Sequence, residues 1–89
     1  MTYTLVLSDN ALEDIKALKS TGNRALIIKL NTLLEELVDH PYTGTGKPEQ
    51  LKNNLTGLWS RRINKRHRLV YSINNDLVIV YVLSAKGHY

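Results

Sequence analysis

One stretch of the sequence decides the fold: Leu77-Val78-Ile79-Val80-Tyr81-Val82-Leu83. Successive side chains of a β-strand point to opposite faces of the sheet, and here apolar residues occupy odd and even positions alike. A strand that is apolar on both faces is typical of the centre of a sheet. The stretch therefore predicts a central strand that helices cover on at least one side.

Two strand-like segments precede the central strand. Leu55–Ile63 and Arg68–Ile73 are rich in apolar and β-branched residues. The polar clusters Asn64-Lys65-Arg66 and Asn74-Asn75-Asp76, which are typical of turns, separate the three segments. Because each connection is short, consecutive segments form hairpins, and the C-terminal half is predicted to be an antiparallel meander.

The N-terminal part begins with a strand and continues as a helix. Tyr3–Leu7 has the composition of a strand, and the helix-starting cluster Ser8-Asp9-Asn10 follows it. Asn10 and Glu13 have the spacing of a capping box, which places the helix start at Asn10. Apolar residues then recur at helical spacing up to Gly22: Ala11, Leu12, Ile15 and Leu18.

A second helix follows a turn at Thr21-Gly22-Asn23 and ends before Pro41. It carries a wide apolar stripe: Leu26, Ile27, Leu30, Leu33, Leu34 and Leu37. Neither helix can hide its apolar face alone, so we expect a helical hairpin packed on the sheet. The predicted fold class is α+β, in the order βααβββ.

Composition limits the size and the partners of the protein. A chain of 89 residues is predicted to form one domain, residues 1–89, because so small a core cannot be divided. The absence of cysteine excludes disulfides and thiolate zinc sites. The net charge of +4 and a pI near 9.5 favour a polyanionic partner. No apolar run approaches the about 20 residues that span a bilayer, and the start lacks the basic region of a signal peptide, so we expect a cytoplasmic protein.

A candidate catalytic carboxylate lies in the polar segment Tyr42–Asn54. This segment contains Gly44, Gly46 and Pro48, and is predicted to be a loop that exposes Glu49 and Lys52. Glu49 is the only carboxylate between Asp39 and Asp76, and two flanking lysines favour its ionised form. Taken alone, it is equally well interpreted as half of a surface ion pair.

Other residues supply the remaining groups that metal-free RNA cleavage needs: a cation for the charged phosphorane and an acid for the departing 5′-oxygen. Strand alternation predicts that Arg62 and Arg68 share an exposed face, opposite to Arg61 and Leu69. An imidazole titrates near neutrality, so His88 can act as the acid, although a terminal histidine is more often frayed.

Most basic residues lie in the second half of the chain: Lys47, Lys52, Arg61, Arg62, Lys65, Arg66, Arg68 and Lys86. From charge alone, a solvated surface is a simpler interpretation than a binding site.

Tyr89 can stack on an unpaired base. His40 is interpreted as a charge partner of the helix end and His67 as a partly buried structural residue. The sequence contains no HExxH, P-loop or GxGxxG motif, so no metal or cofactor is expected.

Four spaced motifs make the pattern specific: Gly44-Thr45-Gly46-Lys47-Pro48-Glu49-Gln50-Leu51-Lys52, Asn54-Leu55-Thr56-Gly57-Leu58-Trp59-Ser60-Arg61-Arg62-Ile63, His67-Arg68-Leu69-Val70-Tyr71 and Gly87-His88-Tyr89. Together they closely resemble the YoeB/Txe-type toxins of the RelE superfamily, over nearly the whole chain. The resemblance implies the RelE-like, microbial-RNase-like fold. It also implies a type II toxin-antitoxin toxin that cleaves messenger RNA in the ribosomal A site.

The resemblance assigns roles to individual residues. It implies that Glu49 is the general base, Arg68 the transition-state cation, His88 the general acid and Tyr89 the residue that orients the substrate. Lys52 and Arg62 match positions that place positive charge near the scissile phosphate. The wider predicted RNA-binding set adds four residues: Lys47, Arg61, Lys65 and Arg66. Trp59 is expected to serve packing.

The resemblance also implies partners. These are a cognate antitoxin, YefM/Phd-like or RelB-like, the ribosome with its message, and operator DNA through the antitoxin complex; a homodimer is possible. Two segments depart from the better-known member of the family. Ser84–Gly87 is a longer connection before the histidine, and Lys65-Arg66 replaces acidic residues.

Two further functions are also compatible with the sequence. The first is a noncatalytic module that grips ribosomal RNA or an acidic protein with the same basic face and inhibits translation by occupancy. The second is a transcriptional co-regulator that acts through an antitoxin complex, since the chain has no recognisable helix-turn-helix of its own.

Overall fold

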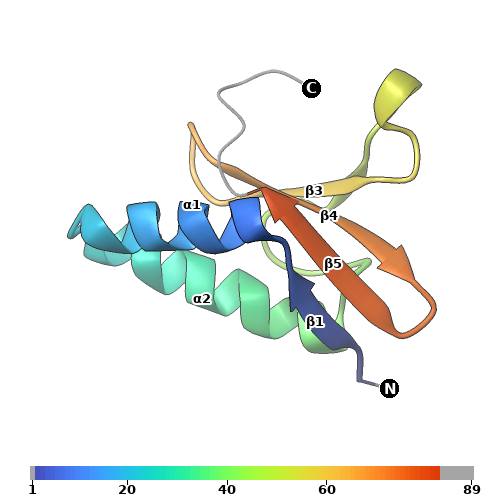
Figure 1. Cartoon of the computed structure of the whole chain (residues 1–89), viewed down its shortest axis with the longest axis horizontal. Coiled ribbons are helices and arrows are strands. Elements are labelled where there is room, and N and C mark those ends of the chain that lie inside the picture. Colours follow the sequence, from blue (N-terminus) through green and yellow to red (C-terminus); the bar gives the residue numbers. More distant parts are fainter. Residues whose placement is uncertain (1, 83–89) are drawn as a thin grey trace.

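The computed structural model describes residues 2–82 of the chain (Figure 1). The elements in chain order are β1 (Thr4–Leu7), α1 (Asp9–Ser20), α2 (Arg24–Asp39), β2 (Glu49–Gln50), the 3₁₀ turn η1 (Asn53–Leu55), β3 (Trp59–Arg62), β4 (Arg68–Asn74) and β5 (Leu77–Val82). The predicted α+β class is confirmed, with one additional short strand, β2. Within residues 2–82, no helix is both long enough and apolar enough to cross a membrane.

The five strands form one mixed sheet in the order β1-β5-β4-β3-β2. β5 lies between β1, to which it is parallel, and β4, to which it is antiparallel. The antiparallel meander from β3 to β5 is therefore confirmed, and β5 is an inner strand as its two apolar faces predicted. Figure 1 shows α1 and α2 side by side, next to β1 and β5.

The core fills the space between the helical hairpin and one face of the sheet. Four leucines of α2 are buried at helical spacing: Leu26, Leu30, Leu33 and Leu37. They belong to one apolar cluster with alternate residues of β4 and β5, including Leu69, Tyr71, Val78 and Val80. Tyr71 and Val80 are direct partners in the register, so their side chains lie on the same face. The predicted packing of the helical stripes on the sheet is confirmed except at Leu12 of α1, which is 45% exposed.

The segment before β3 differs from its prediction in two ways. Glu49 and Gln50 form a short edge strand, β2, where a loop was predicted, because they pair with Ser60 and Trp59 of β3. The strand predicted to start at Leu55 starts at Trp59 instead. Leu55 ends the 3₁₀ turn, and Gly57 then adopts φ of 97°, a left-handed conformation that is incompatible with a strand.

The start of α1 lies in the predicted cluster Ser8-Asp9-Asn10, but the capping residue differs from the one that the capping-box spacing indicated. Ser8, not Asn10, caps the helix: it is extended, with φ of −68° and ψ of 164°, and its Oγ accepts a hydrogen bond of 3.0 Å from the backbone N–H of Ala11. Asn10 lies inside the first turn, where its side chain cannot cap the helix. The sequence offered three adjacent capping residues, and the first of them caps the helix.

The capping assignment predicts opposite outcomes for two alanine substitutions. Ser8→Ala removes the acceptor for an otherwise unpaired backbone N–H and should lower the free energy of unfolding by about 1 kcal/mol. Asn10→Ala should be neutral or slightly stabilising, because alanine has the higher helix propensity. Urea unfolding monitored by circular dichroism measures both. A larger loss in Asn10→Ala than in Ser8→Ala would contradict the assignment.

Candidate active site

The register of β2, β3 and β4 places two of the candidate catalytic residues, Glu49 and Arg68, on one face of the sheet. The side chain of Arg61 reaches Glu36 of α2, so Arg61 marks the helix-covered face. Its neighbours Ser60 and Arg62 therefore point to the opposite face. Glu49 pairs directly with Ser60, and Arg68 pairs directly with Arg62. The prediction that Arg62 and Arg68 share a face is confirmed.

Glu49 and Arg68 form an ion pair on this face. Nη1 of Arg68 donates to Oε1 of Glu49 at 3.1 Å. The side chain of Arg68 is 30% exposed and that of Glu49 is 58% exposed. β3 lies between their strands, so the two side chains meet across it. Residues 19 positions apart in the sequence thus bring an anion and a guanidinium into contact at the surface. Such a pair can hold a phosphate on its cation and take a proton on its anion.

Exposed cations surround this pair. Arg62 lies beside Arg68 on β3, and Lys47 and Lys52 lie before and after β2, all three in exposed positions. Lys65 and Arg66 are exposed in the turn between β3 and β4. The predicted general acid His88 and the predicted orienting residue Tyr89 lie outside the described residues. We refer below to Glu49, Arg62 and Arg68 as the acid–base face.

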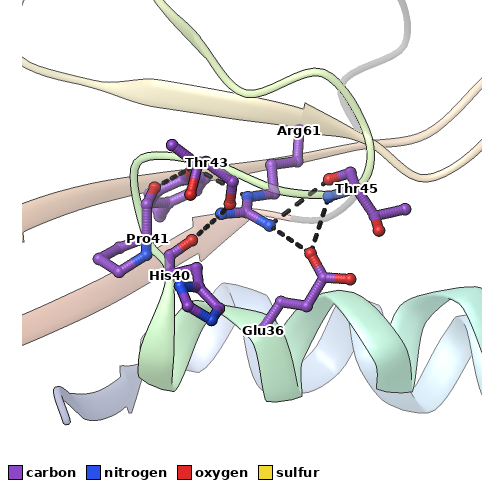
Figure 2. Close-up of polar contacts among 7 residues, drawn as sticks. Glu36, His40, Pro41, Thr43, Thr45 and Arg61 are labelled. Carbon is purple, nitrogen blue, oxygen red and sulfur yellow. Dashed lines mark hydrogen bonds and ion pairs between the residues drawn. The ribbon is translucent and has the colours of Figure 1, made fainter. Parts of the chain in front are cut away.

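Arg61 lies on the other side of the sheet and is completely buried. Figure 2 shows its guanidinium enclosed by the segment that follows α2. Nη1 pairs with Oε1 of Glu36 at 3.1 Å and also donates to the carbonyl of Thr45 at 3.4 Å. Nη2 donates to the carbonyls of His40 and Thr43, the latter at 2.6 Å. A buried cation here organises residues 40–45 through their backbone oxygens.

Tyr71 completes this buried network. Its hydroxyl accepts a hydrogen bond of 3.2 Å from Nε of Arg61 and donates one of 2.8 Å to the carbonyl of Pro41. Burial raises the pKa of Tyr71, an effect that hydrogen bonding from Arg61 partly offsets. The phenol therefore stays protonated and remains a donor to the Pro41 carbonyl.

The inclusion of Arg61 in the RNA-binding set is corrected by this arrangement. A guanidinium with no exposed surface, already bonded to a carboxylate and three carbonyls, cannot contact RNA. The sequence held a signal for this: Trp59 and Ile63, two residues away on either side, are apolar and share its face. Glu36, its partner, was not identified from the sequence because it stands among the polar residues of a helix.

Two glycines allow the chain to wrap around this network. Gly44 and Gly46 have φ of 118° and 87°, which residues with a side chain rarely adopt. A Cβ on Gly44 would collide with Oε1 of Glu36, and a Cβ on Gly46 would lie 2.7 Å from the carbonyl oxygen of Arg62. The Gly44-Thr45-Gly46 sequence therefore closes over the Glu36–Arg61 pair, and the backbone N–H of Arg62 bonds to the carbonyl of Gly46.

Glu36 is the anion of the buried network. Hydrogen bonding from Thr45 is the largest influence that lowers the pKa of Glu36, and the Arg61 guanidinium adds to it; partial burial opposes both. The backbone N–H of Thr45 donates to Oε1 of Glu36 at 2.7 Å. Glu36 is therefore ionised throughout the physiological pH range and holds both the guanidinium and the loop backbone.

Comparison with known proteins shows the family of this chain. The model of the YoeB-like toxin of bacterial type II toxin-antitoxin systems matches residues 7–89. Toxin YoeB of Escherichia coli K12 is 38% identical over 85 residues, which are 96% of this chain and 98% of that protein. This chain belongs to the YoeB-like toxin family. The family match spans Glu49, Arg62 and Arg68, and its range also includes His88 and Tyr89.

Solved YoeB structures share the fold. The YoeB/ParE toxin from Agrobacterium tumefaciens is 32% identical, with a TM-score of 0.83 over 97% of this chain and 99% of that one. The YoeB dimer from Staphylococcus aureus is 36% identical, with a TM-score of 0.82 over the whole of both chains. YoeB from the same species in a complex with YefM is 37% identical, with a TM-score of 0.80 over both whole chains.

Removal of the Arg61 guanidinium is predicted to destabilise the protein strongly. Arg61→Met leaves the carbonyls of residues 40, 43 and 45 without this donor and Glu36 without its cation, and should cost about 3 kcal/mol. Arg62→Met, at the adjacent exposed position, should change stability by no more than about 0.5 kcal/mol. Chemical unfolding of both variants gives the comparison. Equal stability of the two would show that the buried network contributes nothing.

The lowered pKa of Glu36 predicts an acid-dependent contribution to stability. A carboxylate whose pKa is lowered by folding stabilises the protein at any pH above the ordinary pKa of the group, which is 4.5 for a glutamate. This contribution to stability is lost as the pH falls through the pKa of the folded state. Glu36→Gln should therefore be less stable than wild type at neutral pH, with a gap that narrows below pH 4.5. Urea unfolding across this range measures the gap. Glu35→Gln, one position away and exposed, is the control, and a gap that stays constant would contradict the prediction.

Proposed function

We propose that the protein is the toxin of a type II toxin-antitoxin module and an endoribonuclease that cleaves messenger RNA in the ribosomal A site. The observation that carries the proposal is the contact between Glu49 and Arg68 on an exposed, basic sheet face. Membership in the YoeB-like family supports the toxin role. The ribosomal A site is proposed from the resemblance to that family.

In the proposed reaction the 2′-hydroxyl oxygen attacks the adjacent phosphorus. Glu49 removes the 2′-hydroxyl proton as the new O–P bond forms, and Arg68 neutralises the charge that develops on the phosphorane. The bond from phosphorus to the 5′-oxygen then breaks, and His88 gives its proton to that oxygen. The products are a 2′,3′-cyclic phosphate and a 5′-hydroxyl, and Tyr89 orients the substrate. No metal or cofactor takes part.

The resting ion pair is compatible with this role because it is exposed. Ion pairs in water contribute about 0–1 kcal/mol, so a substrate phosphate can replace the Glu49 carboxylate on Arg68 at little cost. The exchange leaves the carboxylate free to accept a proton beside the phosphate. Arg62 and Lys52 are the nearby exposed cations that we propose to bind the flanking phosphates, with Lys47, Lys65 and Arg66 contacting RNA farther away.

An antitoxin is the proposed protein partner. The related Staphylococcus aureus toxin forms a complex with YefM. The exposed cations around β2 and β3 support a partner with an acidic segment, because complementary charges steer association. We propose that such a partner covers the acid–base face, that operator DNA is bound only through the complex, and that the protein acts in the cytoplasm. A homodimer like that of the Staphylococcus aureus toxin is a further proposed assembly.

Loss of the base is predicted to slow cleavage strongly. Glu49→Gln should lower the single-turnover cleavage rate of a message on programmed ribosomes by at least about 100-fold, because general acid–base catalysis contributes about 10²–10⁴-fold. Glu35→Gln, an exposed glutamate of α2, should cleave at the wild-type rate. Analysis of the product ends should find a cyclic phosphate and a 5′-hydroxyl.

The same experiment separates an enzyme from a binding module. A variant with both Glu49→Gln and His88→Ala should bind ribosomes and leave the message intact and cell growth unimpaired. If this double variant still cleaves at the wild-type rate, the assigned acid and base are wrong. If it is inactive in cleavage yet arrests growth as wild type does, the protein inhibits translation by occupancy.

A further inference from the structure

The hydroxyl of Ser60 has an unusual position in the acid–base face. Ser60 is completely buried in the middle of β3, and its Oγ is a buried side-chain atom with no hydrogen-bond partner within residues 2–82. A buried polar group without a partner is unfavourable and rare, since folding removes its bonds to water. Packing alone would favour alanine over serine at this position, so the hydroxyl of Ser60 calls for another explanation.

The register places this hydroxyl beside the proposed base. Ser60 pairs directly with Glu49 of β2 on one side and with Val70 of β4 on the other. Residues paired directly across antiparallel strands have Cβ atoms about 4.5–5.5 Å apart and point to the same face. A hydroxyl at the end of a one-carbon side chain is thus within reach of the Glu49 carboxylate.

The ion pair between Glu49 and Arg68 passes over this part of β3. Glu49 stands opposite Ser60, and Arg68 stands opposite Arg62, two residues farther along the same strand and face. Because the carboxylate and the guanidinium are in contact at 3.1 Å, they meet above β3 between Ser60 and Arg62. The small side chain of Ser60 leaves room for the ion pair to pass over β3. It also places a hydroxyl beneath the ion pair.

We propose that Ser60 positions the general base by donating a hydrogen bond from its hydroxyl to the Glu49 carboxylate once Arg68 has turned to the substrate phosphate. This inference rests on the proposed endoribonuclease function. In the resting protein, Arg68 donates to the carboxylate, and the hydroxyl has no acceptor within residues 2–82. In the complex, one carboxylate oxygen accepts from Ser60 and the other receives the 2′-hydroxyl proton. Ser60 keeps its own proton throughout.

The charged groups around Glu49 set the background for this hydrogen bond. Arg62 of β3 and Arg68 of β4 share its face, and Lys47 and Lys52 flank it along its own segment. All four are cations, and their attraction for the carboxylate does not depend on Ser60. What Ser60 adds is one directed hydrogen bond, which stabilises the carboxylate and fixes which of its oxygens points at the 2′-hydroxyl.

Removal of the hydroxyl should separate activity from stability. Ser60→Ala is expected to unfold at the wild-type temperature or above it, because an unpaired buried hydroxyl is removed. Its single-turnover cleavage rate on programmed ribosomes should fall about tenfold, the effect of one hydrogen bond to a charged group. The acid limb of its pH–rate profile should move to higher pH, because the carboxylate loses a donor that favours its ionised form.

Two matched variants complete the test. Ser20→Ala removes an exposed serine hydroxyl from the end of α1 and should leave the rate and the pH profile unchanged. Ser60→Cys keeps nearly the same volume with a weaker donor and should fall between wild type and Ser60→Ala. The melting temperature of each variant is measured on the same preparation, so a loss of folded protein is not mistaken for a loss of chemistry.

The outcomes distinguish this inference from the proposed function. If wild type cleaves and Ser60→Ala matches it in rate and pH profile, the inference is overturned and the endoribonuclease function stands. A slower Ser60→Ala whose acid limb is unchanged would also overturn it, since the loss would then be steric. If wild type does not cleave messages on ribosomes, the proposed function fails and the role of Ser60 fails with it.

Discussion

The guanidinium of Arg61 is the interaction on which the rest of the site depends. It is completely buried, and an unpaired charge there would be strongly unfavourable. Its bonds to Glu36 and to three loop carbonyls compensate for the lost hydration and fix the path of residues 40–45. A loop without regular structure thus acquires a defined shape from one side chain of a neighbouring strand.

Three consecutive residues of β3 connect this buried network to the acid–base face. The side chain of Arg61 holds the start of the loop, the backbone N–H of Arg62 holds Gly46, and Ser60 pairs with Glu49. The loop therefore reaches β2 with its position set, and Glu49 emerges opposite the face that contains Arg61. The stabilising contacts and the proposed chemistry lie on opposite faces of one short strand. Arg61 can therefore stabilise the fold while the adjacent Arg62 lies on the face proposed to bind RNA.

The contrast between the two ion pairs follows from their surroundings. The Glu36–Arg61 pair is largely removed from water and bonded on several sides, so it is suited to hold one structure. The Glu49–Arg68 pair has the same N–O distance of 3.1 Å but is exposed, so water and a phosphate can compete for its cation. Similar chemistry serves as a permanent anchor in one place and as an exchangeable contact in the other. This division is consistent with the proposed function, in which the protein stays folded while its acid–base face accepts RNA.

Periodicity and composition determined the fold class, the order of the elements and the shared face of Arg62 and Arg68, because alternation along a strand is a local property of the backbone. The family motifs singled out Glu49 and Arg68 as candidate catalytic residues. Only the tertiary structure decided that Arg61 is buried and that Ser60, also buried, pairs with Glu49. Those facts depend on which segments meet across the sheet and on the path of the loop after α2, and no local pattern encodes contacts between residues 25 positions apart.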